Sequence, residues 1–327
     1  MVKIKRKIVQ HGPSTLIISL PSQWVKQHGV RKGDELDVKE QDKTLIISVD
    51  KVIADYSLTQ DISGFNSFLL TRFLGRSYQK GYDKLYLIHN NPELLKAVQE
   101  KILELIGYEI IEQNDKNCVI QSISSHIELD FENSLRKAFL IVKQIIENCY
   151  DAYKNEDTST LQNLYLKDIQ VNRFCYFCQR QINKEQYVPF EQSQQSHVLY
   201  YLIEVLEDLG DTYKKLAQEL AASKKKNKEV LGLLKLIFEQ FDVSYSFFYK
   251  ATLEKANRAF ELYIDIGKKI NEIVGTGLIP SEIFSVYKIK EASKMVYHIT
   301  TMRLDMLKDT KLSSEPNSLT LDIYTKA

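Results

Sequence analysis

The first 33 residues of this 327-residue chain contain no aspartate and no glutamate. The chain as a whole is nearly neutral, with 44 lysines and arginines against 43 acidic residues. Acidic residues begin abruptly at Asp34, so the absence belongs to one short segment. A localised positive electrostatic field on a small module is typical of proteins that bind polyanions, and nucleic acid is the simplest such partner.

The low numbers of glycine, proline and cysteine residues, and the lack of long apolar runs, exclude several classes of protein. The chain has 12 glycines and 6 prolines, too few for the many turns of an all-β architecture. No run approaches the roughly 20 apolar residues that span a bilayer, and no secretion signal follows the basic start. We therefore expect a cytoplasmic protein without membrane insertion. Only four cysteines are present, which predicts free thiols and no disulfide framework.

The motifs of common catalytic sites are also missing. The sequence has no Gly-x-Gly-x-x-Gly segment, no phosphate loop and no Gly-x-Ser-x-Gly segment. Cys175 and Cys178 form a lone Cys-x-x-Cys pair inside a predicted helix, without the further ligands that a zinc site needs, so we expect a buried structural pair. No pattern places a nucleophile beside a base, and we predict that the protein is not an enzyme.

Hydrophobic periodicity divides the chain into four regions. We predict a small domain of short strands around one helix, a small α+β linker domain, an all-α body and a flexible tail, at residues 1–51, 52–126, 127–308 and 309–327. In the linker domain the pattern favours helices over 62–79 and 92–106, and strands over 84–88, 108–112 and 118–123. In the body it favours helices near 130–154, 158–183, 193–222, 227–253, 255–275 and 281–308. The six helices form two sets of three with similar lengths, which suggests an internal duplication.

The basic segment interleaves its cations with polar side chains that suit nucleic acid. Lysine and arginine neutralise phosphates, and glutamine, serine and threonine can donate to phosphates or base edges. Lysines on an exposed edge strand also discourage aggregation, which is the alternative explanation for Lys3 and Lys5 alone. The absence of acids over 33 residues favours nucleic-acid binding.

This segment resembles a known family. It reads Arg6-Lys-Ile-Val-Gln-His-Gly-Pro-Ser-Thr-Leu-Ile-Ile-Ser-Leu-Pro-Ser-Gln-Trp24, followed by the turn Gly29-Val-Arg-Lys-Gly-Asp34. Both parts are similar to the AbrB/SpoVT/MazE family of swapped-hairpin DNA-binding domains. The resemblance implies that two chains exchange hairpins into one dimeric β-barrel and bind double-stranded DNA through one face. The residues that it places at the DNA are Lys5, Arg6, Lys7, Gln10, Ser14 and Thr15. The module has more lysine than this family usually shows, and lysine offers a point charge where arginine offers a bidentate fork.

A second group of residues lies in the third predicted helix of the body. Glu204, Glu207, Asp208 and Asp211 follow helical spacing and share one face, opposite an apolar stripe at 202, 206, 209, 213 and 216. Carboxylate oxygens in such a cluster suit a divalent metal or iron. The same spacing also occurs on an ordinary solvated helix face, where Lys214 and Lys215 would offset the negative charge. Both interpretations stay open.

The segment Glu207-Asp-Leu-Gly-Asp211 with Lys215-Leu-Ala is similar to a signature of PhoU proteins, phosphate-uptake regulators built from two three-helix bundles. The resemblance implies metal ligands at Glu207 and Asp211, with Glu204 and Asp208 as further candidates. An asparagine of the signature is Lys215 here. The order of an AbrB-like head, an α+β segment and a PhoU-like body resembles archaeal phosphate-uptake regulators.

Together these features predict a dimeric, DNA-binding transcriptional regulator linked to phosphate uptake. Its body would sense or dock a phosphate-transport or signalling protein and alter how the paired heads present their basic faces. Two alternatives remain. In the first, the head only dimerises a signalling adaptor that binds a transporter or sensor kinase. In the second, the MazE-like head belongs to an antitoxin, against which the long helical body argues.

Overall fold

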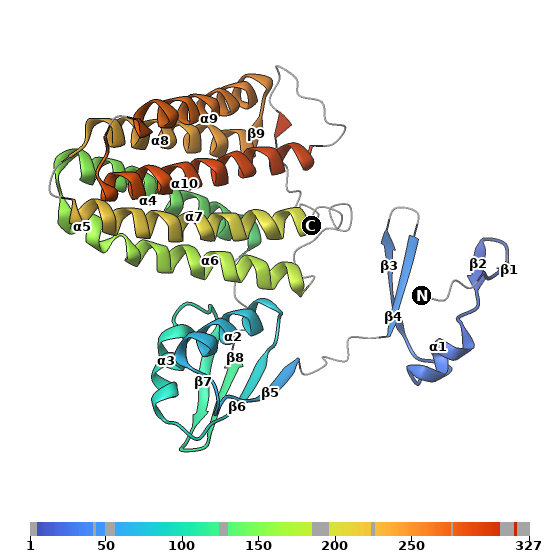
Figure 1. Ribbon diagram of the computed structural model, residues 1–327. Coiled ribbons are helices and arrows are strands. Elements are labelled where there is room, and N and C mark those ends of the chain that lie inside the picture. Colours follow the sequence, from blue (N-terminus) through green and yellow to red (C-terminus); the bar gives the residue numbers. More distant parts are fainter. Residues whose placement is uncertain are drawn as a thin grey trace. The chain divides into compact units, whose positions relative to one another are not determined.

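The structure is a computed structural model that describes residues 5–41, 44–49, 56–123, 130–184, 196–223, 226–275, 277–307 and 317–318. The chain divides into two compact units, Met1–Asp55 and Tyr56–Ala327 (Figure 1). In the described ranges no helix is both long and apolar enough to cross a membrane.

The first unit consists of two β-hairpins and one short helix. Its elements are β1 (Ile8–His11), β2 (Thr15–Ile18), α1 (Ser22–Gln27), β3 (Leu36–Gln41) and β4 (Thr44–Val49). Among the described residues, β1 pairs with β2 alone and β3 pairs with β4 alone, both antiparallel. Gly12 has a φ of 75°, a left-handed conformation that glycine adopts without strain, and this lets the chain turn between β1 and β2.

The sequence pattern correctly predicts the strands and the helix of this unit, but the described residues of one chain form no closed barrel. None of the side chains described in this unit is buried. The described side chains of a single copy thus form no hydrophobic core in this unit. Residues 1–4 of the predicted small domain lie outside the described ranges.

The second unit begins with an α+β part. Its elements are β5 (Ser57–Asp61), α2 (Ser67–Gln79), β6 (Lys84–Ile88), α3 (Glu93–Ile102), β7 (Tyr108–Gln113) and β8 (Asn117–Ser122). The sheet has the order β5-β6-β8-β7, with β5 and β6 parallel and the other neighbours antiparallel. The predicted helix at 62–79 begins later, at Ser67, because the Asn66 side chain caps it by accepting from the Leu69 amide at 2.8 Å. Strand β5 was absent from the sequence-based expectation.

The helical body follows. Its helices are α4 (Phe131–Asn155), α5 (Thr158–Asn163), α6 (Tyr165–Asn183), α7 (Ser196–Ala222), α8 (Lys228–Tyr249), α9 (Leu253–Val274) and α10 (Pro280–Asp305). Most bounds agree with the predicted helices to within a few residues. The helix predicted at 158–183 is interrupted at Leu164. The helix predicted at 227–253 ends at Tyr249, because β9 (Lys250–Ala251) follows and pairs with β10 (Asn317–Ser318) from the segment predicted as a loose tail.

One hydrophobic core runs through the body. Helices α4, α6 and α7 contact one another, as do α8, α9 and α10, while α7–α10 and α4–α8 contacts join the two groups (Figure 1). The apolar stripe of α7 is fully buried in this core, as its spacing predicts. All four cysteines are free thiols, and they are buried, as was predicted for Cys175 and Cys178. Burial raises the pKa of Cys118 to about 11, so this thiol stays protonated at neutral pH.

The α+β part packs directly against the body through the C-terminal half of α6. Arg180 is buried there, and its guanidinium donates to the carbonyl oxygens of Tyr78 at 2.9 Å and Tyr82 at 2.7 Å. The same group forms an ion pair with Asp83 at 2.6 Å, and Lys184 binds this carboxylate at 2.6 Å. Buried charges are stable only when they are paired and hydrogen-bonded, so these contacts fix α6 to the sheet.

Candidate functional sites

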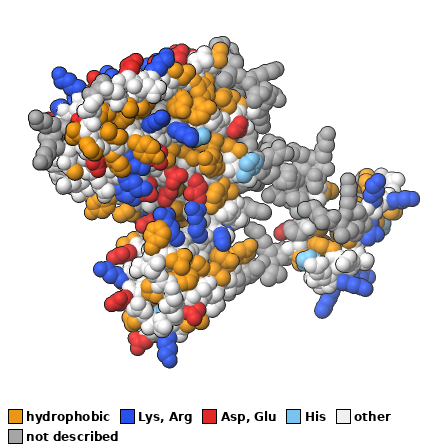
Figure 2. All heavy atoms as spheres, in the orientation of Figure 1, with side chains coloured by type: hydrophobic (Ala, Val, Ile, Leu, Met, Phe, Trp, Pro, Cys, Tyr) orange, Lys and Arg blue, Asp and Glu red, His pale blue; other side chains and the backbone are white. Residues whose placement is uncertain are grey.

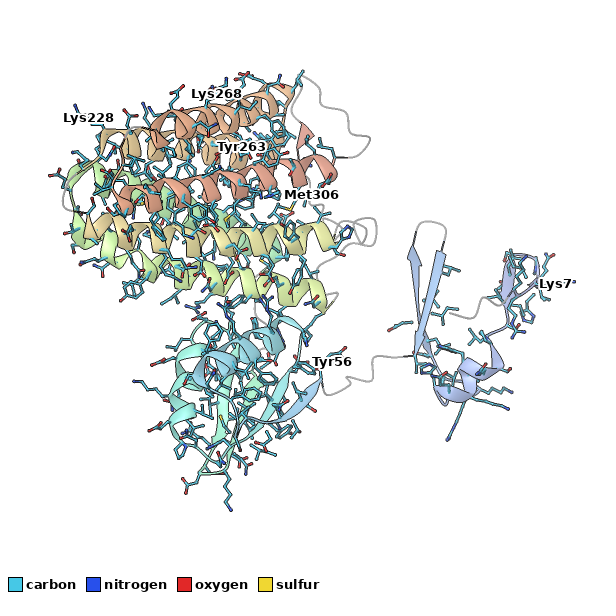
Figure 3. All side chains as sticks on the ribbon, in the orientation of Figure 1. Lys7, Tyr56, Lys228, Tyr263, Lys268 and Met306 are labelled. Atoms are coloured by element: carbon cyan, nitrogen blue, oxygen red, sulfur yellow. The ribbon has the colours of Figure 1, made fainter. Side chains whose placement is uncertain are left out.

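The first candidate site is the basic end of the first unit. Lys5, Arg6 and Lys7 directly precede β1, and Figure 3 shows Lys7 beside the β1–β2 hairpin. Ser14 lies in the turn between the strands. All the residues that the family resemblance places at DNA are exposed. Figure 2 shows more basic than acidic side chains over the described part of this unit.

The register of the hairpin separates two of these residues. Gln10 is opposite Leu16, whereas Thr15 is opposite His11, one position further along β1. Because neighbouring residues of a strand point to opposite faces, Gln10 and Thr15 project from different faces of the hairpin. Within one hairpin, the residues predicted to contact DNA are therefore spread around the turn and the strand edge. They do not form one flat surface.

The second candidate site lies on the carboxylate face of α7. This face is not an open, solvent-exposed cluster of free carboxylates, because α2 and α6 cover part of it. Glu204 accepts from the Arg76 guanidinium at 2.5 Å, and Glu207 accepts from the Tyr176 hydroxyl at 3.2 Å. Asp211 forms an ion pair with Lys214, while Asp208 remains exposed. In the structure Glu204, Glu207 and Asp211 lie towards the α+β part, whereas Asp208 lies outside this group and is exposed to solvent.

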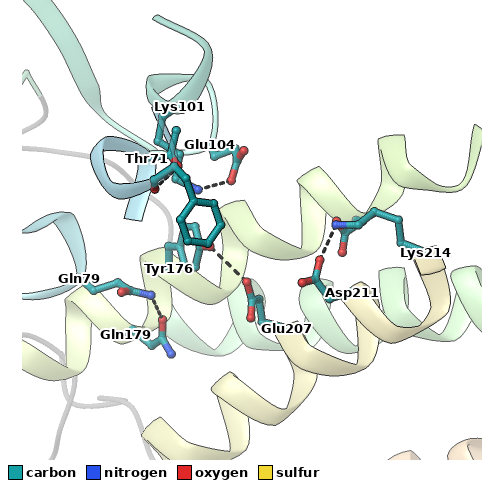
Figure 4. Close-up of polar contacts among 11 residues, drawn as sticks. Thr71, Gln79, Lys101, Glu104, Tyr176, Gln179, Glu207, Asp211 and Lys214 are labelled. Carbon is teal, nitrogen blue, oxygen red and sulfur yellow. Dashed lines mark hydrogen bonds and ion pairs between the residues drawn. The ribbon is translucent and has the colours of Figure 1, made fainter. Parts of the chain in front are cut away.

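A pocket of about 300 Å³ opens between α2, α3, α6 and α7 (Figure 4). Its lining includes Arg72, Lys101, Asn172, Tyr176, Glu207 and Asp211. Gly75 in α2 lets a lysine lie close to the helix, since a Cβ atom there would approach Lys101 Cε to 3.4 Å. Figure 2 shows acidic and basic side chains gathered where the α+β part meets the helices.

Electrostatics single out Glu207 within this pocket. It is 9% exposed, and this burial raises the pKa of its carboxyl to about 7. The negative charges of Asp211 and Asp208 raise the pKa further, whereas the hydrogen bond from Tyr176 opposes the shift. Glu207 therefore exists in both protonation states near neutral pH, which is unusual for a glutamate.

Several carboxylates of this face already bind donors and cations of the protein itself. Across the described ranges, no group of three His, Cys, Asp or Glu side chains is arranged to hold a metal ion. The Lys214 ammonium lies 2.6 Å from Asp168 and also binds Asp211, so a cation of the protein already takes the position beside Asp211. The metal site at Glu207 and Asp211 stays a prediction from sequence, and binding there would require Lys214 to move.

Sequence reasoning did not reveal the pocket, because its walls come from four elements. Arg72, Lys101 and Tyr176 carry no motif, and only Glu207 and Asp211 attracted attention through their spacing. A buried aromatic such as Tyr176, which also packs into the core of the α+β part, is normally interpreted as a core residue. Only the contact between α6 and the α+β part turns it into a pocket wall.

Replacing Glu207 with glutamine is expected to stabilise the protein increasingly as pH rises. The pKa of the folded carboxyl, about 7, exceeds the ordinary 4.5, so the unfolded chain loses this proton first. The contribution of this carboxyl to stability therefore falls as pH rises from about 4.5 to about 7 and then levels off. Glutamine keeps an acceptor for Tyr176 without that loss. Denaturant unfolding at about pH 5 and pH 8 should show an advantage on the order of 2 kcal/mol only at the higher pH.

The exposed Asp208, on the same helix, provides the control. At about pH 8, Asp208→Asn should change the free energy of unfolding less than Glu207→Gln does. An equal stabilisation by Glu207→Gln at both pH values would contradict the raised pKa.

Comparison with known proteins concerns the first unit. The family model described as antidote-toxin recognition MazE, bacterial antitoxin, matches residues 9–52. A search among curated proteins finds no match to the chain. The matched residues cover β1 to β4 and stop before the second unit. At residues 9–52 the chain thus carries a domain of the MazE/AbrB type, a class typical of dimeric DNA-binding regulators and antitoxins, and this domain is followed by a helical body.

Proposed function

We propose that the protein is a homodimeric, DNA-binding transcriptional regulator linked to phosphate uptake. The observation that carries the proposal is the combination, in one module, of the MazE-type match with an acid-free segment whose exposed residues Lys5, Arg6 and Lys7 directly precede β1. Lysine and arginine at these positions neutralise DNA phosphates, while Gln10, Ser14 and Thr15 offer hydrogen bonds beside them.

Exposed apolar side chains support the two-chain arrangement. Ile8, Leu16 and Ile18 lie on one face of the β1–β2 hairpin and are 66%, 67% and 52% exposed. Val38 and Leu45 in the second hairpin are 61% and 63% exposed. A domain of about 50 residues with no buried core is unstable by itself, and pairing with a second copy would bury these side chains.

Leu16→Asp is therefore expected to shift the protein from dimer to monomer. Burying a leucine contributes about 2 kcal/mol, and a dimer would place one such side chain from each copy in the shared core. Sedimentation of the full chain over a range of concentrations measures the change. Leu103→Asp is the matched control, since Leu103 is 72% exposed but lies beyond α3 in the second unit. A monomeric natural protein, or an unchanged dimer after Leu16→Asp, would refute the arrangement.

The helical body supports the phosphate-uptake part of the proposal. Helices α4, α6 and α7 contact one another, as do α8, α9 and α10, with α7–α10 contacts between them, and α7 carries the Glu207–Asp211 segment that resembles the PhoU signature. On this account the body docks a phosphate-transport or signalling protein, and that partner favours one arrangement of the paired heads over another. Such coupling requires that the partner bind the two arrangements with different affinity.

Recovery of the DNA that the protein binds in its own cells tests this function. The full chain is crosslinked, isolated, and its DNA sequenced from cells grown with and without sufficient phosphate. We expect a small set of sites, enriched upstream of phosphate-transport genes, whose occupancy changes with phosphate. If the recovered DNA contains no specific sites, the proposal of a transcriptional regulator is wrong. If it contains specific sites unrelated to phosphate, the proposed link to phosphate uptake is wrong.

An antitoxin is the second candidate, favoured by the description of the matching family. In that case a toxin would copurify with the protein, and a toxin gene would lie beside its gene. A signalling adaptor whose head only dimerises would copurify with a transporter or sensor kinase and would leave no specific DNA in the recovery experiment. The recovered DNA and the copurifying proteins thus distinguish a transcriptional regulator, an antitoxin and a signalling adaptor.

A further inference from the structure

The pocket between α2, α3, α6 and α7 has the features of a ligand site. It lies wholly within the second unit, so the inference drawn from it does not depend on whether the first unit binds DNA. Its volume of about 300 Å³ falls at the lower end of small-molecule sites. The walls come from both the α+β part and the body, so a bound molecule would contact both.

Two side chains of the pocket lining each carry a buried acceptor oxygen that has no hydrogen-bond partner among the described residues. These oxygens are Asn172 Oδ1 and Gln79 Oε1, on side chains only 9% and 2% exposed. A buried polar atom without a partner costs about 1–3 kcal/mol, so such atoms normally bind a partner that the protein itself does not supply. Both atoms accept hydrogen bonds, and the missing partner must therefore donate them.

The two acceptors mark different ends of the pocket. Gln79 donates through its amide nitrogen to Gln179 at 2.5 Å, and Gln179 is seven residues after Asn172 on α6. Seven residues of helix extend about 10 Å. The pocket is therefore polar along its length, which favours a polar ligand over an apolar one.

Charge indicates the sign of the group that donates near Asn172. Glu207 and Asp211 line the same pocket, and the Glu207 carboxyl is itself buried. Glu100 from α3 and Glu104 just beyond its C-terminal end add two more carboxylates, but Lys101 pairs with Glu104 and Lys214 pairs with Asp211. Among the described residues Glu207 makes no ion pair, so at its carboxylate a primary ammonium group, with three donors and a positive charge, fits better than an inorganic anion.

Arg72 supplies a position for a negative group on the same ligand. It lines the pocket from α2, and among the described residues it makes no ion pair. Its guanidinium lies 5.5 Å from the ring centre of Phe68, an exposed residue of the same lining. The other cations are engaged, since Arg76 binds Glu204, Lys101 binds Glu104 at 2.6 Å, and Lys214 binds Asp168 and Asp211.

We propose that this pocket binds a small zwitterion of the free amino acid class, with its ammonium group at Asn172 and Glu207 and its carboxylate at Arg72. The ammonium group satisfies the buried oxygen of Asn172 and offsets the acidic charge. The carboxylate gives Arg72 its partner through a charge-assisted hydrogen bond. The ligand joins α2 to α6 and α7 and so stabilises the contact between the α+β part and the body.

Calorimetric titration of the full chain with individual L-amino acids, supported by thermal unfolding, tests this site. We expect at least one amino acid to bind and to raise the unfolding temperature, as any ligand of the folded state does. The corresponding amine without the carboxylate and the corresponding acid without the amine should each bind at least about tenfold more weakly. Inorganic phosphate and Mg²⁺ are titrated separately and should not bind in the pocket.

Two variants locate the binding. Asn172→Leu removes the unpartnered oxygen while keeping the volume, so it should abolish amino acid binding without lowering the unfolding temperature of the free protein. Arg72→Gln, at the exposed rim, should weaken binding about tenfold. Arg258→Gln on α9 is the control and should bind normally. Binding by no amino acid, binding insensitive to both variants, or protection by phosphate or Mg²⁺ in its place would overturn the proposal.

Discussion

Replacing Arg180 with methionine is expected to lower the free energy of unfolding by about 3–5 kcal/mol, since the loss of one member of a buried charge pair leaves its partners unsatisfied. The guanidinium donates to the Tyr78 and Tyr82 carbonyls and pairs with Asp83. It also lies 4.9 Å from the ring centre of Tyr78 and 5.4 Å from that of Tyr108. Methionine fills similar space but makes none of these polar contacts.

Denaturant unfolding and amide hydrogen exchange together measure this effect. Exchange should accelerate most in α2 and β6, because Arg180 holds the connection between them onto α6. Arg258→Met is the matched control, since Arg258 is half-exposed and its two ion pairs are 3.7 Å long. Exposed pairs of this kind contribute about 0–1 kcal/mol. An Arg180→Met variant as stable as this control would show that Arg180 does not fix the α+β part to the body.

Arg6→Ala combined with Lys7→Ala is expected to lower affinity for duplex DNA by about 10- to 100-fold at fixed ionic strength, because each phosphate contact contributes through counterion release. Both side chains precede β1 and are exposed, so their removal leaves no cavity. The slope of log K against log salt should become shallower by about 2. Fluorescence anisotropy of a labelled duplex at several salt concentrations provides both quantities.

Lys235→Ala combined with Lys268→Ala removes the same charge from exposed positions of the body and should leave DNA affinity unchanged. Equal loss in both double variants would mean that net charge, and not the position of the cations, controls binding. Unchanged affinity after the Arg6 and Lys7 substitutions would remove the β1 end of the module from the DNA interface.

Much of the local structure follows from the sequence because long amphipathic helices repeat their apolar positions many times. The stripe through Leu202, Leu206 and Leu209 fixes the buried face of α7, and the structure buries all three. Short elements give weaker signals. β5 contains Leu58 as its one strongly apolar residue, so alternation cannot be recognised there. The interruption at Leu164 keeps helical spacing on both sides and leaves no mark in the pattern.

Contacts between distant segments were beyond sequence reasoning for a different reason. Arg180 binds backbone carbonyls, which every residue possesses, so no partner can be recognised in the sequence. Glu207 could be assigned to a carboxylate cluster from its spacing. Its half-ionised state arises from burial and from neighbours such as Tyr176 on another helix. A site shared by four elements becomes visible only once their packing is known.

The natural full chain is titrated into a duplex recovered from cells, at low and at high salt, to test whether the acid-free module binds DNA. We expect tight binding at low salt that weakens by about 10²–10⁴-fold at high salt, because several lysines and arginines of the first unit contact phosphates. Binding that is absent at low salt, or that does not change with salt, would contradict a DNA-binding function for the acid-free module.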